Sequence, residues 1–257
     1  MSKSAQNPVT AAILVIGDEI LSGRTRDENI FEIAQVCTQG GVDLREVRII
    51  GDVESEIVEA VNVLRARYTY VFTTGGIGPT HDDITADAVA KAFGVELPVN
   101  RDVCELLEKR YGKEALTPAN KRMARIPVGA SLIDNGVSGA PGFCLENVYV
   151  MAGVPIIMRS MLESIAPTLK GGRVMHSRSV LVGVGESKIA KGLGDVQDQY
   201  ESIKIGSYPR MGKKPVYTEV VLRGTDLALL DEATQKVQKI VDAEHAANKI
   251  EIGQQDN

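Results

Sequence analysis

Short apolar runs alternate with amphipathic stretches along the first 94 residues of the chain. The apolar runs are rich in β-branched residues, which is typical of parallel strands buried on both faces. Between them, apolar residues recur at the three- and four-residue spacing of a helix. We expect strands within residues 10–17, 42–50 and 68–75, and helices within residues 27–41, 52–67 and 82–94. This alternation predicts an α/β domain with a doubly wound sheet.

The pattern loosens after Gly94 and changes again after the sequence KGG at 170–172, which has the composition of a linker. We expect helices near 101–111, 117–124 and 156–169, and two short strands between 129 and 155. Beyond the linker we expect strands near 173–184, 203–207 and 215–222, and helices near 186–193 and 226–245. The chain therefore divides into a first domain at 8–170 and a small mixed α/β domain at 173–252.

Composition narrows the class of protein. No apolar stretch approaches the roughly 20 residues of a membrane span, and the N-terminus lacks the apolar core of a secretory signal, so we expect a cytoplasmic protein. The net charge of −5 and the absence of a basic stripe argue against nucleic-acid binding. Three cysteines and three histidines are scattered along the chain, which makes a zinc site unlikely on spacing alone. Any metal should have oxygen ligands.

The segment TTGGIGPTHDDIT at 73–85 joins the third expected strand to the third expected helix. A glycine-rich turn before a helix presents free N–H groups and the positive end of the helix dipole, which together bind anions. Thr80 and Asp83 have the spacing of a capping box, which would define the start of the helix. The sequence predicts a phosphate site made by Thr74, Gly75, Gly76, Gly78 and Thr80.

Acidic residues accompany this phosphate loop. Asp82, Asp83 and Asp87 would repel a phosphate unless a divalent cation lay between them. The alternative is that Asp82 and Asp83 only cap the helix and complement its dipole, a role worth about 0.3–1 kcal/mol per charge. Because Asp83 alone could fill that role, we favour a Mg²⁺ ion, or another divalent cation, bound by Asp82 and Asp83.

Two further acidic loops follow the first and second expected strands. Asp18 and Glu19 lie in GDEILSGRTRDEN at 17–29, and Asp52 follows the second strand. Each has an alternative interpretation: the first loop as a surface turn, and Asp52 as a helix cap. Because the carboxyl ends of successive parallel strands meet at one sheet edge, we expect one acidic, phosphate-binding cleft. In the first loop the expected ligand contacts are Gly17, Asp18, Gly23 and Asn29.

Taken in this order, the two long motifs resemble those of the MoaB/Mog domain, and in particular the N-terminal part of the competence/damage-inducible protein A (CinA) family. APGF at 140–143 and AGVP at 152–155 fall where that family has further ligand loops, which implies contacts from Gly142 and Gly153. GES at 185–187 and GSYP at 206–209 resemble the domain that follows in CinA-type chains.

The resemblance implies a three-layer α/β/α domain that binds a molybdopterin or a nucleotide diphosphate. CinA-type members and the related domain of eukaryotic FAD synthase are linked to cleavage of ADP-ribose or FAD-like compounds. By motif, Asp83 and Asp52 match functional acids of the family, and we expect Asp52 or Glu19 to orient the attacking water.

Three functions remain open at this point. The first is a Mg²⁺-dependent pyrophosphatase, a hydrolase acting on ADP-ribose or an FAD-like dinucleotide. The second is molybdopterin adenylyl transfer in molybdenum cofactor biosynthesis. The third is a non-catalytic pterin- or nucleotide-binding module, favoured by Ile157 where the family carries glutamate. In each case the partner is a phosphate-containing small molecule, with no nucleic acid and no membrane, and we expect a homo-oligomer.

Overall fold

The computed structural model describes residues 8–172, 174–210 and 217–255. It divides into two compact units, with the boundary directly after Gly172. Within the part of the chain that the structure describes, every helix is too short or too polar to cross a lipid bilayer.

The first unit is built on a six-stranded sheet of order β2-β1-β3-β6-β5-β4. Its strands are β1 (Thr10–Ile16), β2 (Asp43–Ile50), β3 (Tyr70–Thr74), β4 (Ser131–Ile133), β5 (Gly142–Leu145) and β6 (Val148–Met151). β1, β2, β3 and β6 run parallel, whereas β4 and β5 pair antiparallel at one edge. The carboxyl ends of four strands therefore lie along one edge of the sheet.

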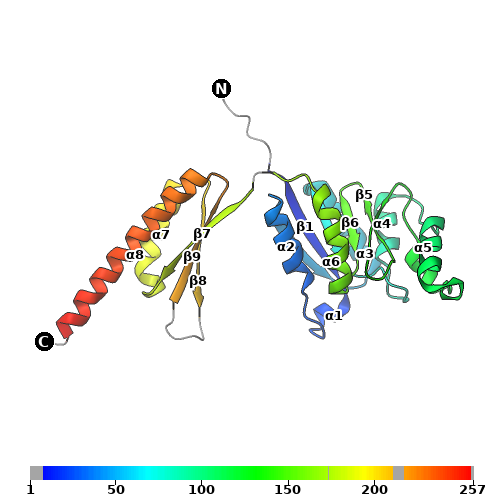
Figure 1. Cartoon of the computed structure of the whole chain (residues 1–257), viewed down its shortest axis with the longest axis horizontal. Coiled ribbons are helices and arrows are strands. Elements are labelled where there is room, and N and C mark those ends of the chain that lie inside the picture. Colours follow the sequence, from blue (N-terminus) through cyan, green and yellow to red (C-terminus); the bar gives the residue numbers. More distant parts are fainter. Residues whose placement is uncertain (1–7, 173, 211–216, 256–257) are drawn as a thin grey trace, which may run out of the picture. The chain divides into compact units, whose positions relative to one another are not determined.

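Helices cover both faces of this sheet (Figure 1). The helices of this unit are α1 (Asp18–Leu21), α2 (Asn29–Gln39), α3 (Glu54–Arg67), α4 (Thr85–Phe93), α5 (Arg101–Tyr111) and α6 (Pro155–Ile165), with short 3-10 helices η1 (Lys113–Ala115), η2 (Asn120–Ala124) and η3 (Ala166–Thr168). One apolar core joins the sheet to α3, α4 and α5, and a second joins its other face to α2 and α6. The predicted three-layer α/β/α class is confirmed.

The main differences from the expected elements lie around the loops. α4 begins at Thr85 and not at Asp82, because the residues before it form turns. The expected helix at 117–124 is a turn followed by the 3-10 helix η2. Between 129 and 155 there are three strands and not two, since a tight hairpin at Glu146 and Asn147 separates β5 from β6.

The second unit packs helices against one three-stranded antiparallel sheet of order β7-β9-β8. Its elements are β7 (His176–Val182), α7 (Glu186–Gln199), β8 (Lys204–Arg210), β9 (Tyr217–Gly224) and α8 (Leu227–Gln255). Alternate strand residues such as Val180, Val220 and Leu222 pack with Leu230 and Val237 of α8. This period-two burial places one face of the sheet against the helices.

Candidate functional site

A cleft of about 530 Å³ opens at the carboxyl ends of β1, β2, β3 and β6. Its lining comes from the segments that follow these strands and from the loop before β5. From the predicted site, the residues that line it are Gly17, Glu19, Asp52, Gly75, Gly76, Gly78, Asp82, Asp83 and Gly153. Residues far apart in the sequence are therefore brought to one place, at the sheet edge where an α/β fold binds its ligands.

The glycine loop begins with a residue that accepts no side chain. Gly75 has a φ of +103°, and a Cβ there would lie 2.0 Å from the carbonyl oxygen of Ile16. Its N–H donates to the Met151 carbonyl over 3.1 Å, and its own carbonyl accepts from the Thr85 hydroxyl over 2.9 Å. Gly75 is thus a structural junction between β1, β6 and α4, and its N–H is not available to a phosphate.

The N–H groups available to an anion lie further along the loop. Among the residues that the structure describes, none accepts a hydrogen bond from the N–H of Gly76, Ile77 or Gly78. All three residues line the cleft. Successive unpartnered N–H groups in a turn form a concave anion site. The N–H groups that a phosphate could reach are therefore those of Gly76, Ile77 and Gly78, and not that of Gly75.

Asp83 is held by a turn that precedes α4. Its Oδ2 accepts hydrogen bonds from the N–H and the hydroxyl of Thr80, over 2.8 and 2.5 Å. The predicted Thr80 to Asp83 pairing is present, but it closes this turn and not the first turn of the helix. Hydrogen bonding to the Thr80 hydroxyl, and to the N–H of Asp82 itself, lowers the pKa of the Asp82 carboxyl. Asp82 and Asp83 both line the cleft.

The loop after β2 presents Asp52 to the same cleft. Its Oδ2 accepts from the N–H of Asp18 over 3.1 Å, and α3 has no side-chain cap, so the helix-cap interpretation of Asp52 is wrong. Burial raises the pKa of Asp52, and the charges of Asp18 and Asp82 are among those that raise it further. A carboxyl with a raised pKa accepts a proton more readily than an ordinary one.

A cation would need the ligand to complete its coordination shell. Among the residues that the structure describes, no group of three or more His, Cys, Asp or Glu side chains is placed to hold a metal ion. Asp82 and Asp83 still line the cleft together with two other acids. Mg²⁺ is commonly bound by one or two carboxylates together with substrate phosphates, so this donor set fits a Mg²⁺ ion that arrives with its ligand.

Six predicted site residues lie outside the cleft lining: Asp18, Gly23, Asn29, Thr74, Thr80 and Gly142. Asn29 is buried and donates from Nδ2 to the Gly153 carbonyl over 2.8 Å, which holds the second ligand loop in place. Thr74 is buried at the end of β3. Gly142 lies inside β5, where a Cβ would be 2.4 Å from the Val150 carbonyl.

The remaining three of these residues have other roles. Asp18 is exposed and contributes its N–H to Asp52, while Gly23, at a φ of +72°, lies in an exposed turn with open space around it. Thr80 supports Asp83 from the turn. Sequence reasoning selected these residues by position after a strand, which places the backbone but does not show which way a side chain points.

Sequence reasoning missed the wall formed by the segment before β5. Asn135 and Ser138 line the cleft, and buried Asn135 orders this loop through hydrogen bonds to Ser138 and Ala140. An asparagine followed by glycine, in DNGVSG, is a turn signal that could have indicated it.

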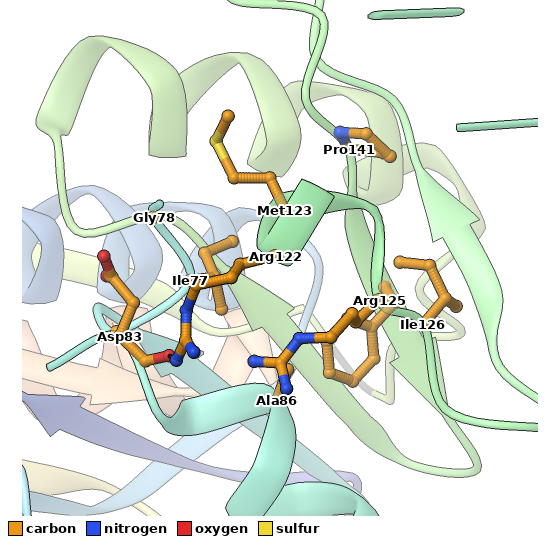
Figure 2. A pocket seen from close by; sticks show the side chains of 11 residues that line it. Ile77, Gly78, Asp83, Ala86, Arg122, Met123, Arg125, Ile126 and Pro141 are labelled. Carbon is orange, nitrogen blue, oxygen red and sulfur yellow. Dashed lines mark hydrogen bonds between the residues drawn. The ribbon is translucent and has the colours of Figure 1, made fainter. Parts of the chain in front are cut away.

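Beside the cleft lies a second, small cavity of about 10 Å³, room for one water molecule at most. It shares Gly76, Gly78 and Asp83 with the cleft and adds Arg122 and Arg125 (Figure 2). Figure 2 shows both guanidinium groups directed toward the segment from Asp83 to Ala86. The sequence carries no motif that would have connected these arginines with the acidic loop about 40 residues earlier.

Comparison with known proteins agrees with this architecture. The family model for a probable molybdopterin-binding domain matches residues 12–171, and the model for the FAD synthase middle domain matches residues 174–249. A protein of Archaeoglobus fulgidus is 33% identical over 229 residues, covering 89% of this chain and 96% of that protein.

Two CinA-type proteins are also similar. A CinA-like protein of Desulfosudis oleivorans is 36% identical over 194 residues, which cover 70% of this chain and 47% of that protein. The crystal structure of the protein CinA from Thermoplasma acidophilum, of unknown function, matches with a TM-score of 0.60 and 33% identity, covering 63% of this chain and 99% of that one. With a family model matching more than half of its length, the chain belongs to the probable molybdopterin-binding domain family, as a CinA-like member whose second unit matches the FAD synthase middle domain.

Proposed function

We propose that this protein is a Mg²⁺-dependent pyrophosphatase that cleaves a dinucleotide such as ADP-ribose or an FAD-like compound. The observation that carries the proposal is the composition of the cleft. Unpartnered N–H groups at Gly76–Gly78 lie in the same cleft as the carboxylates of Asp82 and Asp83. A ligand that satisfies both must be an anion accompanied by a cation, which is the chemistry of a diphosphate with Mg²⁺.

Apolar side chains also line the cleft. Met123, Pro141, Val154, Ile157 and Met161 contribute to this lining. A ligand with a flat ring beside a diphosphate would bury its ring against these side chains. Ile157 suits such a ring better than an acid would. The match of the second unit to the FAD synthase middle domain supports a nucleotide of this type.

The chain's own residues account for the proton in the reaction. When bound, Mg²⁺ would neutralise phosphate charge and help to activate water. Asp52, with its raised pKa, accepts a proton from the attacking water, and Glu19 orients that water from the loop after β1. The water oxygen attacks one phosphorus of the diphosphate, the bond between that phosphorus and the bridging oxygen breaks, and the products are two monophosphates.

Binding tests the proposal directly. Calorimetric titration of ADP-ribose should show at least about tenfold tighter binding with Mg²⁺ than in EDTA, since cation and acids must act together. Equal affinity in EDTA would contradict a role for the cation. Turnover is tested by incubating the protein with ADP-ribose or FAD and measuring the release of AMP.

A pterin ligand is the second candidate, favoured by the match of the first unit to a probable molybdopterin-binding domain. Molybdopterin with ATP should therefore be included in the panel. Transfer of AMP to the pterin, without hydrolysis of ADP-ribose, would favour an adenylyltransferase. Tight binding without any turnover would favour a non-catalytic module.

A further inference from the structure

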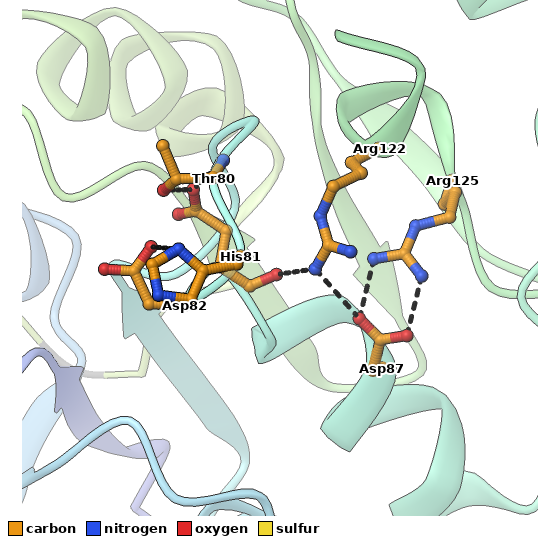
Figure 3. Close-up of polar contacts among 7 residues, drawn as sticks. Thr80, His81, Asp82, Asp87, Arg122 and Arg125 are labelled. Carbon is orange, nitrogen blue, oxygen red and sulfur yellow. Dashed lines mark hydrogen bonds and ion pairs between the residues drawn. The ribbon is translucent and has the colours of Figure 1, made fainter. Parts of the chain in front are cut away.

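Two arginines and an aspartate form a clamp beside the acidic turn, which we call the arginine clamp: Arg122, Arg125 and Asp87 (Figure 3). Arg125 donates from both terminal nitrogens to the two carboxylate oxygens of Asp87, each over 2.7 Å. Asp87 lies in the first turn of α4. This bidentate pair therefore fastens the segment after η2 to the start of the helix.

Arg122 makes a different contact. Its Nη2 donates to the backbone carbonyl of Asp83 over 3.0 Å and lies 4.0 Å from Asp87 Oδ2. Figure 3 shows the dashed contacts from Arg122 reaching both the turn and the helix. Arg122 is thus the member of the clamp that holds the backbone of the turn itself, next to the carboxylates that face the cleft.

The clamp is costly as a purely structural device. The Nε atoms of Arg122 and Arg125 are buried, and no group among the described residues accepts a hydrogen bond from them. A buried donor without a partner is destabilising. Asp87, which the sequence suggested as a third acid of the phosphate site, is neutralised by the clamp and is not available to a cation.

We propose that Arg122 is a positioning residue, which holds the turn of Asp82 and Asp83 in its cleft-lining place through the Asp83 carbonyl. The inference rests on the proposed function in one respect: the benefit of this position is cation-assisted binding of a diphosphate. Arg125 fastens α4 through Asp87 and, among the described residues, makes no hydrogen bond or ion pair with the turn, so it serves as the matched control.

Hydrogen exchange of the full chain, followed by mass spectrometry, tests the positioning without any ligand. In R122Q we expect the hydrogen-bonded amides of the turn segment, those of Thr80, Asp83 and Thr85, to exchange at least tenfold faster than in the unaltered protein. R125Q should lower the melting temperature but leave the exchange of this segment within twofold. In R122Q the affinity for ADP-ribose in the presence of Mg²⁺ should fall about tenfold, whereas the affinity in EDTA should not change.

The outcomes separate the two proposals. Unchanged exchange in R122Q, or an equal increase in R122Q and R125Q, would overturn the positioning role of Arg122. If the unaltered protein shows no Mg²⁺ dependence in ADP-ribose binding, the proposed function fails, and the exchange result still decides the role of Arg122. Should R122Q not fold, R122K replaces it: lysine keeps the charge but not the planar fork, so slow exchange in R122K would show that the directed contact is not needed.

Discussion

Two loops border the cleft and are held very differently. In the β3 loop (75–84), hydrogen bonds tie Gly75 and Gly76 to β6 and α4, tie the Asp83 carbonyl to η2, and join Thr80 to Asp83 within the loop. In the β1 loop (17–28), residues 21–26 are all exposed. Its tertiary hydrogen bonds are from Gly17 N–H to the Ile50 carbonyl and from Asp18 N–H to Asp52.

This difference indicates that the two loops contribute to the site in different ways. The β3 loop places backbone donors and Asp83 in a single arrangement, which suits recognition of a phosphate of defined shape. The β1 loop contributes Glu19 from a short helix whose own surroundings are open. We therefore expect the β3 loop to be sensitive to small changes and the β1 loop to tolerate them.

The largest expected effect on stability comes from adding one methyl group to each loop. Gly75→Ala forces a Cβ onto the Ile16 carbonyl at a φ of +103°, and strain and overpacking together should lower the free energy of unfolding by at least about 3 kcal/mol. Gly23→Ala, at a φ of +72° in open space, should cost only about 1 kcal/mol. Urea denaturation measures both, and similar costs for the two would refute the contrast.

A second pair of variants compares the acids of the two loops. Asp83→Asn should lower turnover of ADP-ribose about 100-fold, equivalent to about 2.7 kcal/mol of transition-state stabilisation. Its unfolding free energy should fall by at most about 1 kcal/mol, because the amide oxygen can still accept from Thr80. Glu19→Gln should lower turnover only about tenfold, since in the proposed mechanism Glu19 orients water and binds no metal. Full activity in Asp83→Asn would end its assignment as a metal ligand.

A third pair removes one hydroxyl that donates a hydrogen bond to each loop. Thr85 is buried and donates to the Gly75 carbonyl over 2.9 Å, so Thr85→Val should cost about 1–2 kcal/mol. Ser22 is exposed and donates to the Glu19 carbonyl over 3.3 Å, so Ser22→Ala should change stability by less than about 0.5 kcal/mol. Thermal unfolding would contradict the comparison if Ser22→Ala were the more damaging change.

The last comparison concerns Asp52, which accepts a hydrogen bond from Asp18 of the β1 loop and lines the cleft together with the β3 loop. Its folded-state pKa is raised above the ordinary 3.8, so its contribution to stability is present below that pH and is lost as the pH rises through the folded-state pKa. Asp52→Asn removes the charge and keeps an acceptor for the Asp18 N–H. At pH 7 the variant should therefore be slightly more stable, by less than about 1 kcal/mol. Denaturation at pH 7 and pH 4.5 tests this, because the gain should shrink at the lower pH.

Much of the first unit could be read from local pattern. The apolar runs predicted β1, β2 and β3 to within about two residues, and Gly41 and Gly94, both at positive φ, lie at the ends of the predicted helices and follow α2 and α4. Asp27, the first residue of the predicted helix 27–41, accepts a hydrogen bond from the Ile30 N–H, which is the contact of a helix cap. These features depend on neighbours within a few residues, so the sequence alone carries them.

The short strands and the start of α4 were less accessible. β4, β5 and β6 have three or four residues each, too few for a period to be recognised. The turn before α4 has the residue spacing of a capping box, although the helix does not begin directly after the capping residue. In each case a local pattern was compatible with two structures, and packing against β3 or η2 selected one.

By itself the sequence determined the alternation of strands and helices, and with it the sheet edge where the acidic loops meet. Only the tertiary structure decided which atoms face the cleft. Asn29 became a support for Gly153, Asp52 received the Asp18 N–H in place of capping α3, and Asp87 was neutralised by Arg125 from 38 residues away. The physical reason is range: backbone preference and periodicity act over a few residues, whereas a buried charge or amide takes its partner from whichever segment the fold packs against it.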